Sequence, residues 1–217
     1  MARDFTLDTQ AAKESNAGSK RIKDSGKYVG KFKAAWYETN SNGTESVHFL
    51  FESSDGLEAG PLALYTHNGK GEQLPSYKTF NAILTCLKLR AVKAQNGTVE
   101  LYDFDTRNMV KKTKEIYPEL AGKTIGLVLQ REQYAKNNGD IGERMVIVAP
   151  FDSANGKVAV EILNNQDAKA LDGLMRWLEA SPIKKLQGGK NRQYGDSYTD
   201  SHAPVSNQFE EDMDIPF

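Results

Sequence analysis

Short segments of alternating apolar and polar residues, separated by turn-forming residues, dominate the middle of the chain and predict a fold built mainly from β-strands. The dipeptide Asn42-Gly43 between the first two segments is a strong hairpin signal, and Asp55-Gly56 marks a second turn. The strands predicted on this basis cover residues 27–39, 46–53, 60–67, 97–104, 123–133 and 141–151. In the second of them, Val47, Phe49 and Phe51 are predicted to share one face.

Two helices are predicted among these strands. Pro75 opens the first at a position that tolerates its missing N–H group, and an apolar stripe follows at spacings of three and four. The second is predicted over residues 166–180 with Asn164 as its cap, and residues 116–120 are expected to form a short helical or turn segment. This order of elements predicts a mainly β fold, an OB-like β-barrel with one inserted helix and a C-terminal helix. An α+β sandwich is the alternative that periodicity leaves open.

The composition of the chain changes after Ser181-Pro182, where aliphatic residues become rare and Gly, Ser, Asn, Gln, Asp and Lys predominate. Such a segment buries too little apolar area to offset the entropy of ordering its backbone, so it is expected to be disordered. The predicted organisation is a flexible N-terminal arm at 1–24, one folded domain at 25–181, a linker at 182–208 and an acidic tip at 209–217.

The residue counts exclude several classes of protein. One cysteine, Cys86, excludes an internal disulfide and a cysteine-based zinc site, and the three histidines show no metal-binding spacing. We therefore expect no metal and no cofactor. No apolar run reaches the roughly 20 residues of a membrane span, and acids stand where a signal peptide would be apolar, which predicts a cytoplasmic protein.

Basic and aromatic residues recur together in the predicted strands, and this combination is typical of proteins that bind single-stranded nucleic acid. Alternation predicts that Lys31, Lys33 and Tyr37 share one face of the first strand, whereas Trp36 lies on the opposite, apolar face. An ordinary solvated sheet face, and a core position for Trp36, are the alternatives that remain open. The candidate contacts to single-stranded DNA are Lys31, Lys33, Trp36, Tyr37, Tyr65, Arg131, Tyr134, Lys136 and Arg144.

No catalytic motif stands out, and we predict that the chain is not an enzyme. The best catalytic candidate is an acidic group, Glu100, Asp103 and Asp105, in which the two aspartates could hold Mg²⁺ as in nucleases. A solvated strand entering a turn explains the same residues more simply. A strand-annealing factor and a pure adaptor remain further alternatives.

The last nine residues combine four carboxylates and no basic group with a final apolar Ile215-Pro216-Phe217. Such a peptide cannot bury itself, but it suits a partner protein that offers an apolar pocket with a basic rim. The predicted partner-binding residues are Asp212, Asp214, Ile215, Pro216 and Phe217. This ending resembles the acidic C-terminal tip of bacterial single-stranded DNA-binding proteins, which typically reads Asp-Asp-Asp-Ile-Pro-Phe.

Residues 5–180 are similar to phage and prophage single-stranded DNA-binding proteins. The similarity rests on the segments that begin Ser25-Gly-Lys-Tyr-Val-Gly-Lys-Phe, Phe49-Leu-Phe-Glu-Ser-Ser-Asp-Gly, Leu64-Tyr-Thr-His-Asn-Gly and Thr85-Cys-Leu-Lys. This resemblance implies a protein that coats single-stranded DNA without strong sequence preference during replication, recombination and repair, in the cytoplasm of a bacterial host cell. The resemblance of the tip implies that the protein recruits partner proteins. The resemblance identifies no DNA-contacting residue.

Overall fold

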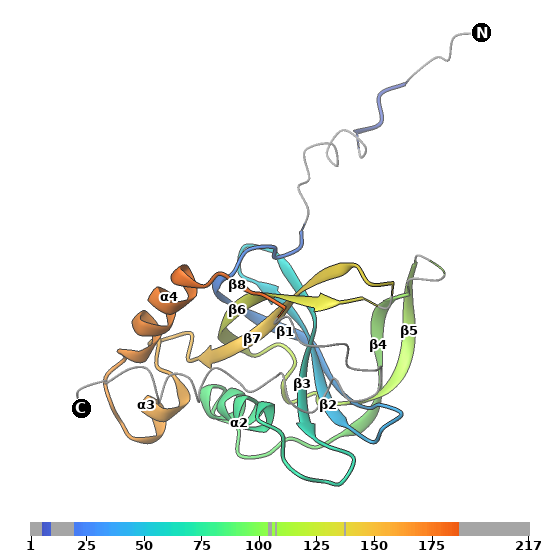
Figure 1. Ribbon diagram of the computed structural model, residues 1–217. Helices are drawn as coiled ribbons and strands as arrows, with labels where there is room; N and C mark the ends of the chain where they lie inside the picture. The colour runs from blue at the N-terminus through green and yellow to red at the C-terminus, as the bar shows by residue number, and fades with distance from the viewer. Residues whose placement is uncertain (1–5, 10–19, 104–105, 107, 137, 187–217) are drawn as a thin grey trace.

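The computed structural model of this 217-residue chain describes residues 6–9, 20–103, 106, 108–136 and 138–186. Within these residues the fold is mainly β, with eight strands in one sheet and three helices (Figure 1). The strands are β1 Gly26–Thr39, β2 Glu45–Ser53, β3 Glu58–His67, β4 Gln95–Asp103, β5 Asn108–Ile116, β6 Thr124–Ala135, β7 Ile141–Phe151 and β8 Ile183–Lys184. The helices are α2 Ser76–Cys86, α3 Ala159–Leu163 and α4 Ala170–Ala180. None of the helices in these ranges is long and apolar enough to cross a bilayer.

Strand β1 is the centre of the sheet because it pairs with three other strands. It pairs antiparallel with β2 over most of its length, with β6 along its N-terminal half, and with β5 only at Trp36 and Tyr37. The remaining antiparallel pairs are β2–β3, β4–β5 and β6–β7, whereas the short β8 pairs parallel to β6. Strand β3 lies near β7, but no backbone ladder joins them among the described residues, so strand pairing does not close the sheet.

The main core lies between one face of β1–β2–β3, the strands β6 and β7, and helix α2. Phe32, Phe49 and Phe51 are fully buried in it, and the rings of Phe32 and Phe49 lie 4.6 Å apart. The prediction that Val47, Phe49 and Phe51 share one face of β2 is confirmed, because alternation brings every second residue to the same face, and in the structure this face points into the core. Helix α4 packs a smaller apolar cluster against β6 and β7, with Leu174 and Leu178 buried.

A β-bulge at Lys33 makes the predicted faces of β1 wrong beyond that residue. Phe32 pairs with Phe51 and Ala34 with Leu50, so Lys33 has no partner on β2 and the alternation shifts by one position. Trp36 therefore lies on the face away from the core. Tyr37 lies opposite Val47 on the inner face, not beside Lys31 and Lys33.

Several element boundaries also differ from the predictions. Strand β5 was not predicted, because three lysines and few apolar residues conceal its alternation. The predicted helix over 166–180 begins only at Ala170, and Asn164 ends α3 instead of capping α4. The side chain of Glu161 performs the capping, because its Oε1 accepts hydrogen bonds from the backbone N–H groups of Lys169 and Ala170 at 2.6 and 2.8 Å.

The two ends of the predicted domain extend beyond residues 25 and 181. Ile22, assigned to the N-terminal arm, is 5% exposed in the main core, and its N–H group donates to the carbonyl of Glu58 at 2.8 Å. Ile183 and Lys184, assigned to the linker, form β8 beside β6. The rest of the predicted linker from residue 187, and the whole acidic tip, lie outside the described residues.

Candidate nucleic-acid interface

The side of β1–β2–β3 that points away from the main core, called the outer face below, carries several of the predicted DNA contacts. Directly opposed residues of an antiparallel pair share a face, so Trp36 shares the outer face with His48, and Ser46 shares it with Tyr65. Lys31 joins them through its pairing with Glu52. The outer face therefore combines lysine and aromatic side chains, with Tyr37 excluded.

Trp36 lies in a closed environment on the outer face. Its side chain is 1% exposed, although it belongs to neither apolar cluster. The indole ring stacks on the imidazole of His48 with centroids 5.4 Å apart, and its Nε1–H donates to Oε1 of Glu38 at 2.9 Å. Lys114, which comes from β5, donates to the same carboxylate oxygen at 2.8 Å. A base cannot reach the Trp36 ring in this arrangement, so the alternative of a buried tryptophan describes it better.

Burial and charge act on the ionisable groups around Trp36. Burial lowers the pKa of His48, and the nearby Lys114 acts in the same direction, whereas Glu38 opposes them. Burial alone would raise the pKa of Glu38, but its hydrogen bonds from Lys114 and Trp36 lower the pKa below the ordinary value. The structure thus favours a neutral His48 beside an ionised Glu38. The salt bridge from Lys114 to Glu38 ties β5 to the outer face, and the Trp36–His48 stack joins β1 to β2 beside it.

The predicted phosphate-binding lysines of β1 are held by carboxylates. Nζ of Lys31 and Nζ of Lys33 each lie 3.5 Å from Glu52, and Lys33 also lies 2.8 Å from Glu58. The hydrogen bond to Glu58 is the main cause that raises the pKa of Lys33. Both lysine side chains remain about half exposed, at 52% and 43%. Ion pairs this exposed contribute about 0–1 kcal/mol, so a phosphate can compete with the carboxylates.

The β6–β7 hairpin carries the other predicted contacts. Arg144 bonds to the buried carboxylate of Glu132, with its Nε at 2.7 Å, and its guanidinium lies 5.5 Å from the centre of the Tyr134 ring. Lys184 of β8 binds the other oxygen of Glu132 at 3.0 Å. Arg144 therefore serves first as the partner of a buried charge and as a support for Tyr134.

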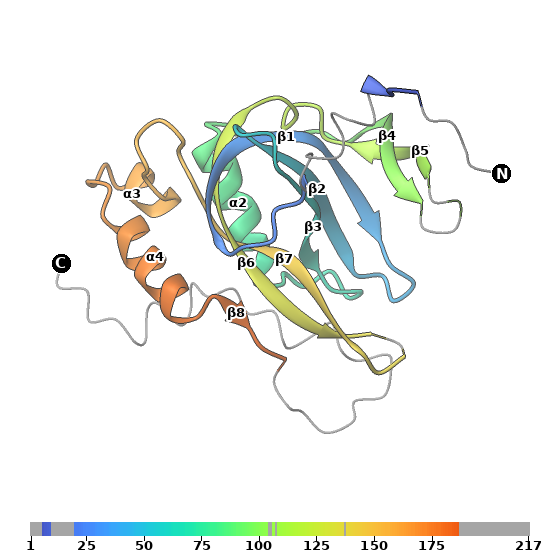
Figure 2. The same cartoon turned by 90° about the horizontal axis from the view of Figure 1, so that it is seen from above.

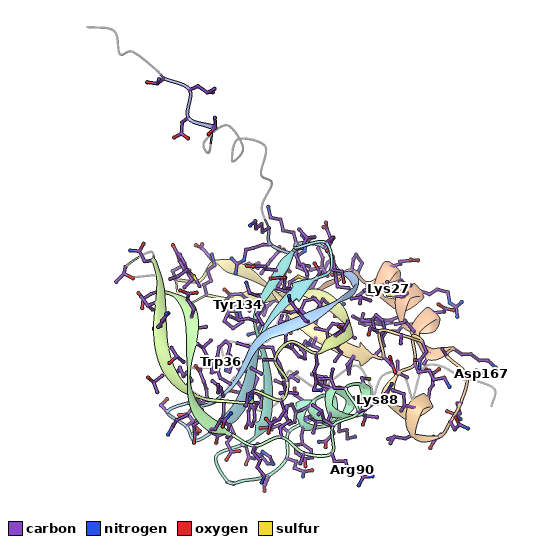
Figure 3. The ribbon with its side chains drawn as sticks, turned by 180° about the vertical axis from the view of Figure 1, so that it is seen from behind. Lys27, Trp36, Lys88, Arg90, Tyr134 and Asp167 are labelled. Carbon is purple, nitrogen blue, oxygen red and sulfur yellow. The ribbon has the colours of Figure 1, made fainter. Side chains whose placement is uncertain are left out.

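The end of this hairpin is more open. Arg131 pairs only loosely with Glu143, at 3.5 Å. Lys136 follows β6, its side chain is exposed, and it forms no ion pair with any residue that the structure describes. Figure 3 shows Trp36 and Tyr134 in the same half of the molecule, away from the helical region that carries Asp167. Among the described residues, the ion pairs of the β1 lysines and those of the hairpin arginines involve different carboxylates.

Two groups of residues near this side were missing from the predicted set. Lys112 and Lys114 lie on β5, and Tyr102 on β4 is the only aromatic residue classed as exposed among the described residues, at 49%. The three lysines within residues 111–114 were the available sequence signal, but without the strand assignment their orientation could not be predicted.

The nuclease alternative gains no support from the described residues. Asp103 bonds to Lys112 at 3.1 Å and accepts hydrogen bonds from Thr106. Glu100 lies on the opposite face of the β4 strand from Asp103, and Asp105 lies outside the described residues. No group of three or more potential metal-binding side chains occurs in the part of the chain that the structure describes.

The predicted partner-binding residues Asp212, Asp214, Ile215, Pro216 and Phe217 all lie outside the described residues. No protein-family model matches the chain, and no curated protein matches it.

Proposed function

We propose that this protein binds single-stranded DNA without strong sequence preference and coats it during replication, recombination and repair. The observation that carries the proposal is the outer face of β1–β2–β3, where the half-exposed Lys31 and Lys33 share a face with the half-buried ring of Tyr65. Cations that neutralise phosphates, next to flat side chains, are what such binding requires. The resemblance of residues 5–180 to phage single-stranded DNA-binding proteins supports the same function.

The fold that we propose is an OB-like barrel that is partly open. Its support is the order of strand pairing, in which β1 pairs with both β2 and β6, and β6 with β7. Helix α2 follows β3 and contacts both β3 and β7, as expected for a helix inserted after the third strand. In OB-folds the outer faces of the second and third strands, with the loops beside them, bind oligonucleotides. The β4–β5 hairpin would then be an addition between α2 and the fourth barrel strand.

Binding on this face would proceed by exchange of partners. Phosphates of the DNA would replace Glu52 and Glu58 as partners of the lysines, and displaced counterions would add a favourable entropy. Tyr65 and Tyr134 are half-buried and would offer ring faces to bases, whereas the buried Trp36 would support the floor of the site. The acidic tip, by its resemblance to bacterial single-stranded DNA-binding proteins, would recruit replication, recombination and repair proteins.

Titration of the full chain with a fluorescent oligo-dT strand tests this function. We expect tight binding in dilute buffer and an affinity that falls steeply with salt, because phosphate contacts release counterions. A duplex of the same length should bind more weakly. Absence of binding to oligo-dT at low salt would refute the proposal.

A further inference from the structure

Strands β4 and β5 form a two-stranded ribbon that is joined to the rest of the sheet at one end. Among the residues that the structure describes, only Trp36 and Tyr37 of β1 pair with it, at Ile116 and Glu115 of β5. The ribbon and the β6–β7 hairpin extend toward the same side of the molecule, where the turn between β1 and β2 also lies (Figures 1 and 2). The ribbon therefore borders the side of the fold that carries the outer face.

The two faces of the ribbon differ in their relation to the outer face. Ile116 lies directly opposite Trp36, so the β5 residues at even spacing from it, Lys114 and Lys112, continue the outer face. Val99 pairs with Lys112 on this face and is only 3% exposed, which shows that this side of the ribbon is turned toward other parts of the protein.

Lys111 lies on the opposite face of the ribbon, as the neighbour of Lys112 in the chain. It pairs with Glu100, and the next pair on the same face is formed by Tyr102 and Met109, whose side chains are 49% and 55% exposed. This side of the ribbon faces solvent. Two lysines that are adjacent in sequence thus point in opposite directions, one with the outer face and one away from it.

The lysines on the outer-face side are positioned by carboxylates at the base and the end of the ribbon. Lys114 binds Glu38 at 2.8 Å, and Lys112 binds Asp103 at 3.1 Å. Their side chains remain 29% and 46% exposed. Two residues apart on a strand, their backbone positions are about 6.8 Å apart, which is comparable to the distance between successive phosphates of an extended single strand.

We propose that the Lys112 and Lys114 side of the β4–β5 ribbon is a second wall of the polynucleotide site and binds the phosphodiester backbone of a single strand. This inference rests on the proposed function. It adds to that function a site on an element outside the strands of the proposed barrel, which are β1, β2, β3, β6 and β7. Lysines on β1 and on the ribbon flank the Trp36–His48 stack, and all share one continuous face. A strand crossing that face would meet cations on both sides of the Trp36–His48 stack, whose buried indole supports the site from below. The carboxylates hold the lysines in place until phosphates replace them.

The test compares Lys112→Gln with Lys111→Gln, which remove the same charge from neighbouring positions on opposite faces. Oligo-dT affinity of the full chain is measured over a series of salt concentrations. Lys112→Gln should weaken binding several-fold at low salt and reduce the slope of log K against log salt by about 0.7, the value of one phosphate contact on a single strand. Lys111→Gln should leave both quantities close to those of the unmodified protein, and Lys112→Arg should restore the slope.

A second measurement avoids the variants and any effect that they have on folding. Lysine acetylation of the unmodified protein, read by mass spectrometry with and without oligo-dT, should show protection of Lys112 and Lys114 but not of Lys111. Equal effects of the two Gln variants, or equal protection of Lys111 and Lys112, would overturn the ribbon site while the proposed function stands. Failure of the unmodified protein to bind oligo-dT would instead remove the proposed function itself.

Discussion

Glu52 forms ion pairs with two of the proposed DNA-binding lysines, so replacing it by Gln should strengthen DNA binding instead of weakening it. Its carboxylate bridges Lys31 and Lys33 at 3.5 Å, and it also lies directly opposite Glu58 on β3. Like charges in directly opposed positions destabilise a sheet. Glu52→Gln therefore removes a competitor for phosphate and a repulsion in the same step, so DNA binding should become tighter.

The magnitude follows from the exposure of the groups. The side chains of Lys31, Lys33 and Glu52 are 52%, 43% and 30% exposed, so each ion pair is worth at most about 1 kcal/mol. Lys33 keeps Glu58 at 2.8 Å after the change, so most of the gain comes from Lys31. We expect a gain in binding free energy of about 1 kcal/mol, which corresponds to roughly fivefold higher affinity for oligo-dT at low salt.

The assay is the oligo-dT titration at several salt concentrations, with Glu179→Gln on helix α4 as the matched control. That control removes the same charge from an exposed position on a different element, so it reports the effect of net charge alone. The advantage of Glu52→Gln over the control should shrink as salt screens the interaction. Equal affinities for the two variants, or weaker binding by Glu52→Gln, would refute the role of Lys31 and Lys33 as phosphate ligands.

Four further predictions concern other parts of the molecule. The pKa of His48 is lowered in the folded protein, so the unfolded chain binds a proton at His48 more readily. The free energy of unfolding should therefore fall as the pH drops below about 6.5, the ordinary pKa of histidine. In thermal melts at different pH values, a His48→Gln variant should show a flatter dependence of stability on pH. Burial raises the pKa of Cys86 to about 12, so its thiol should not react with a thiol reagent at pH 8 until the protein is unfolded. Tyr134→Ala should weaken oligo-dT binding at least about fivefold by removing a stacking ring, whereas Tyr134→Phe should not, as measured by the same titration. Deletion of Phe217 should leave oligo-dT affinity unchanged and abolish capture of replication and repair proteins in a pull-down; loss of DNA binding would contradict the separate roles of tip and domain.

Alternation predicted the elements that bury one complete face. In β2, apolar residues at every second position point to the core without interruption, and the prediction for Val47, Phe49 and Phe51 was confirmed. In β5, by contrast, the exposed ribbon tolerates lysines on both faces, so its sequence lacks the apolar period that marks a strand. A strand can be recognised in a sequence when one of its faces is buried and therefore apolar, and few residues of β5 are buried.

The candidate site was predictable in residue type but not in its contacts. Lysines and aromatic residues stood out as a composition, yet their ion pairs depend on cross-strand register, as in the pairing of Lys31 with Glu52. Register depends on turns and bulges, which the pattern of apolar and polar residues in a single sequence does not specify. Hence the sequence indicated which cations to consider, but not that most of them have carboxylate partners.

The bulge at Lys33 links these two findings. By adding one residue to β1 without a partner on β2, it turns Trp36 to the outer face, where Ile116 of β5 pairs with it and Glu38 receives its indole N–H. The same bulge directs the Lys33 side chain to Glu52 and Glu58. A regular β1 would place Trp36 in the core and would remove its indole from the carboxylate of Glu38, which Lys114 of the ribbon also binds. The bulge at Lys33, which made the predicted faces of β1 wrong, is therefore the feature that places the lysines, the aromatic stack and the ribbon on one side of the sheet.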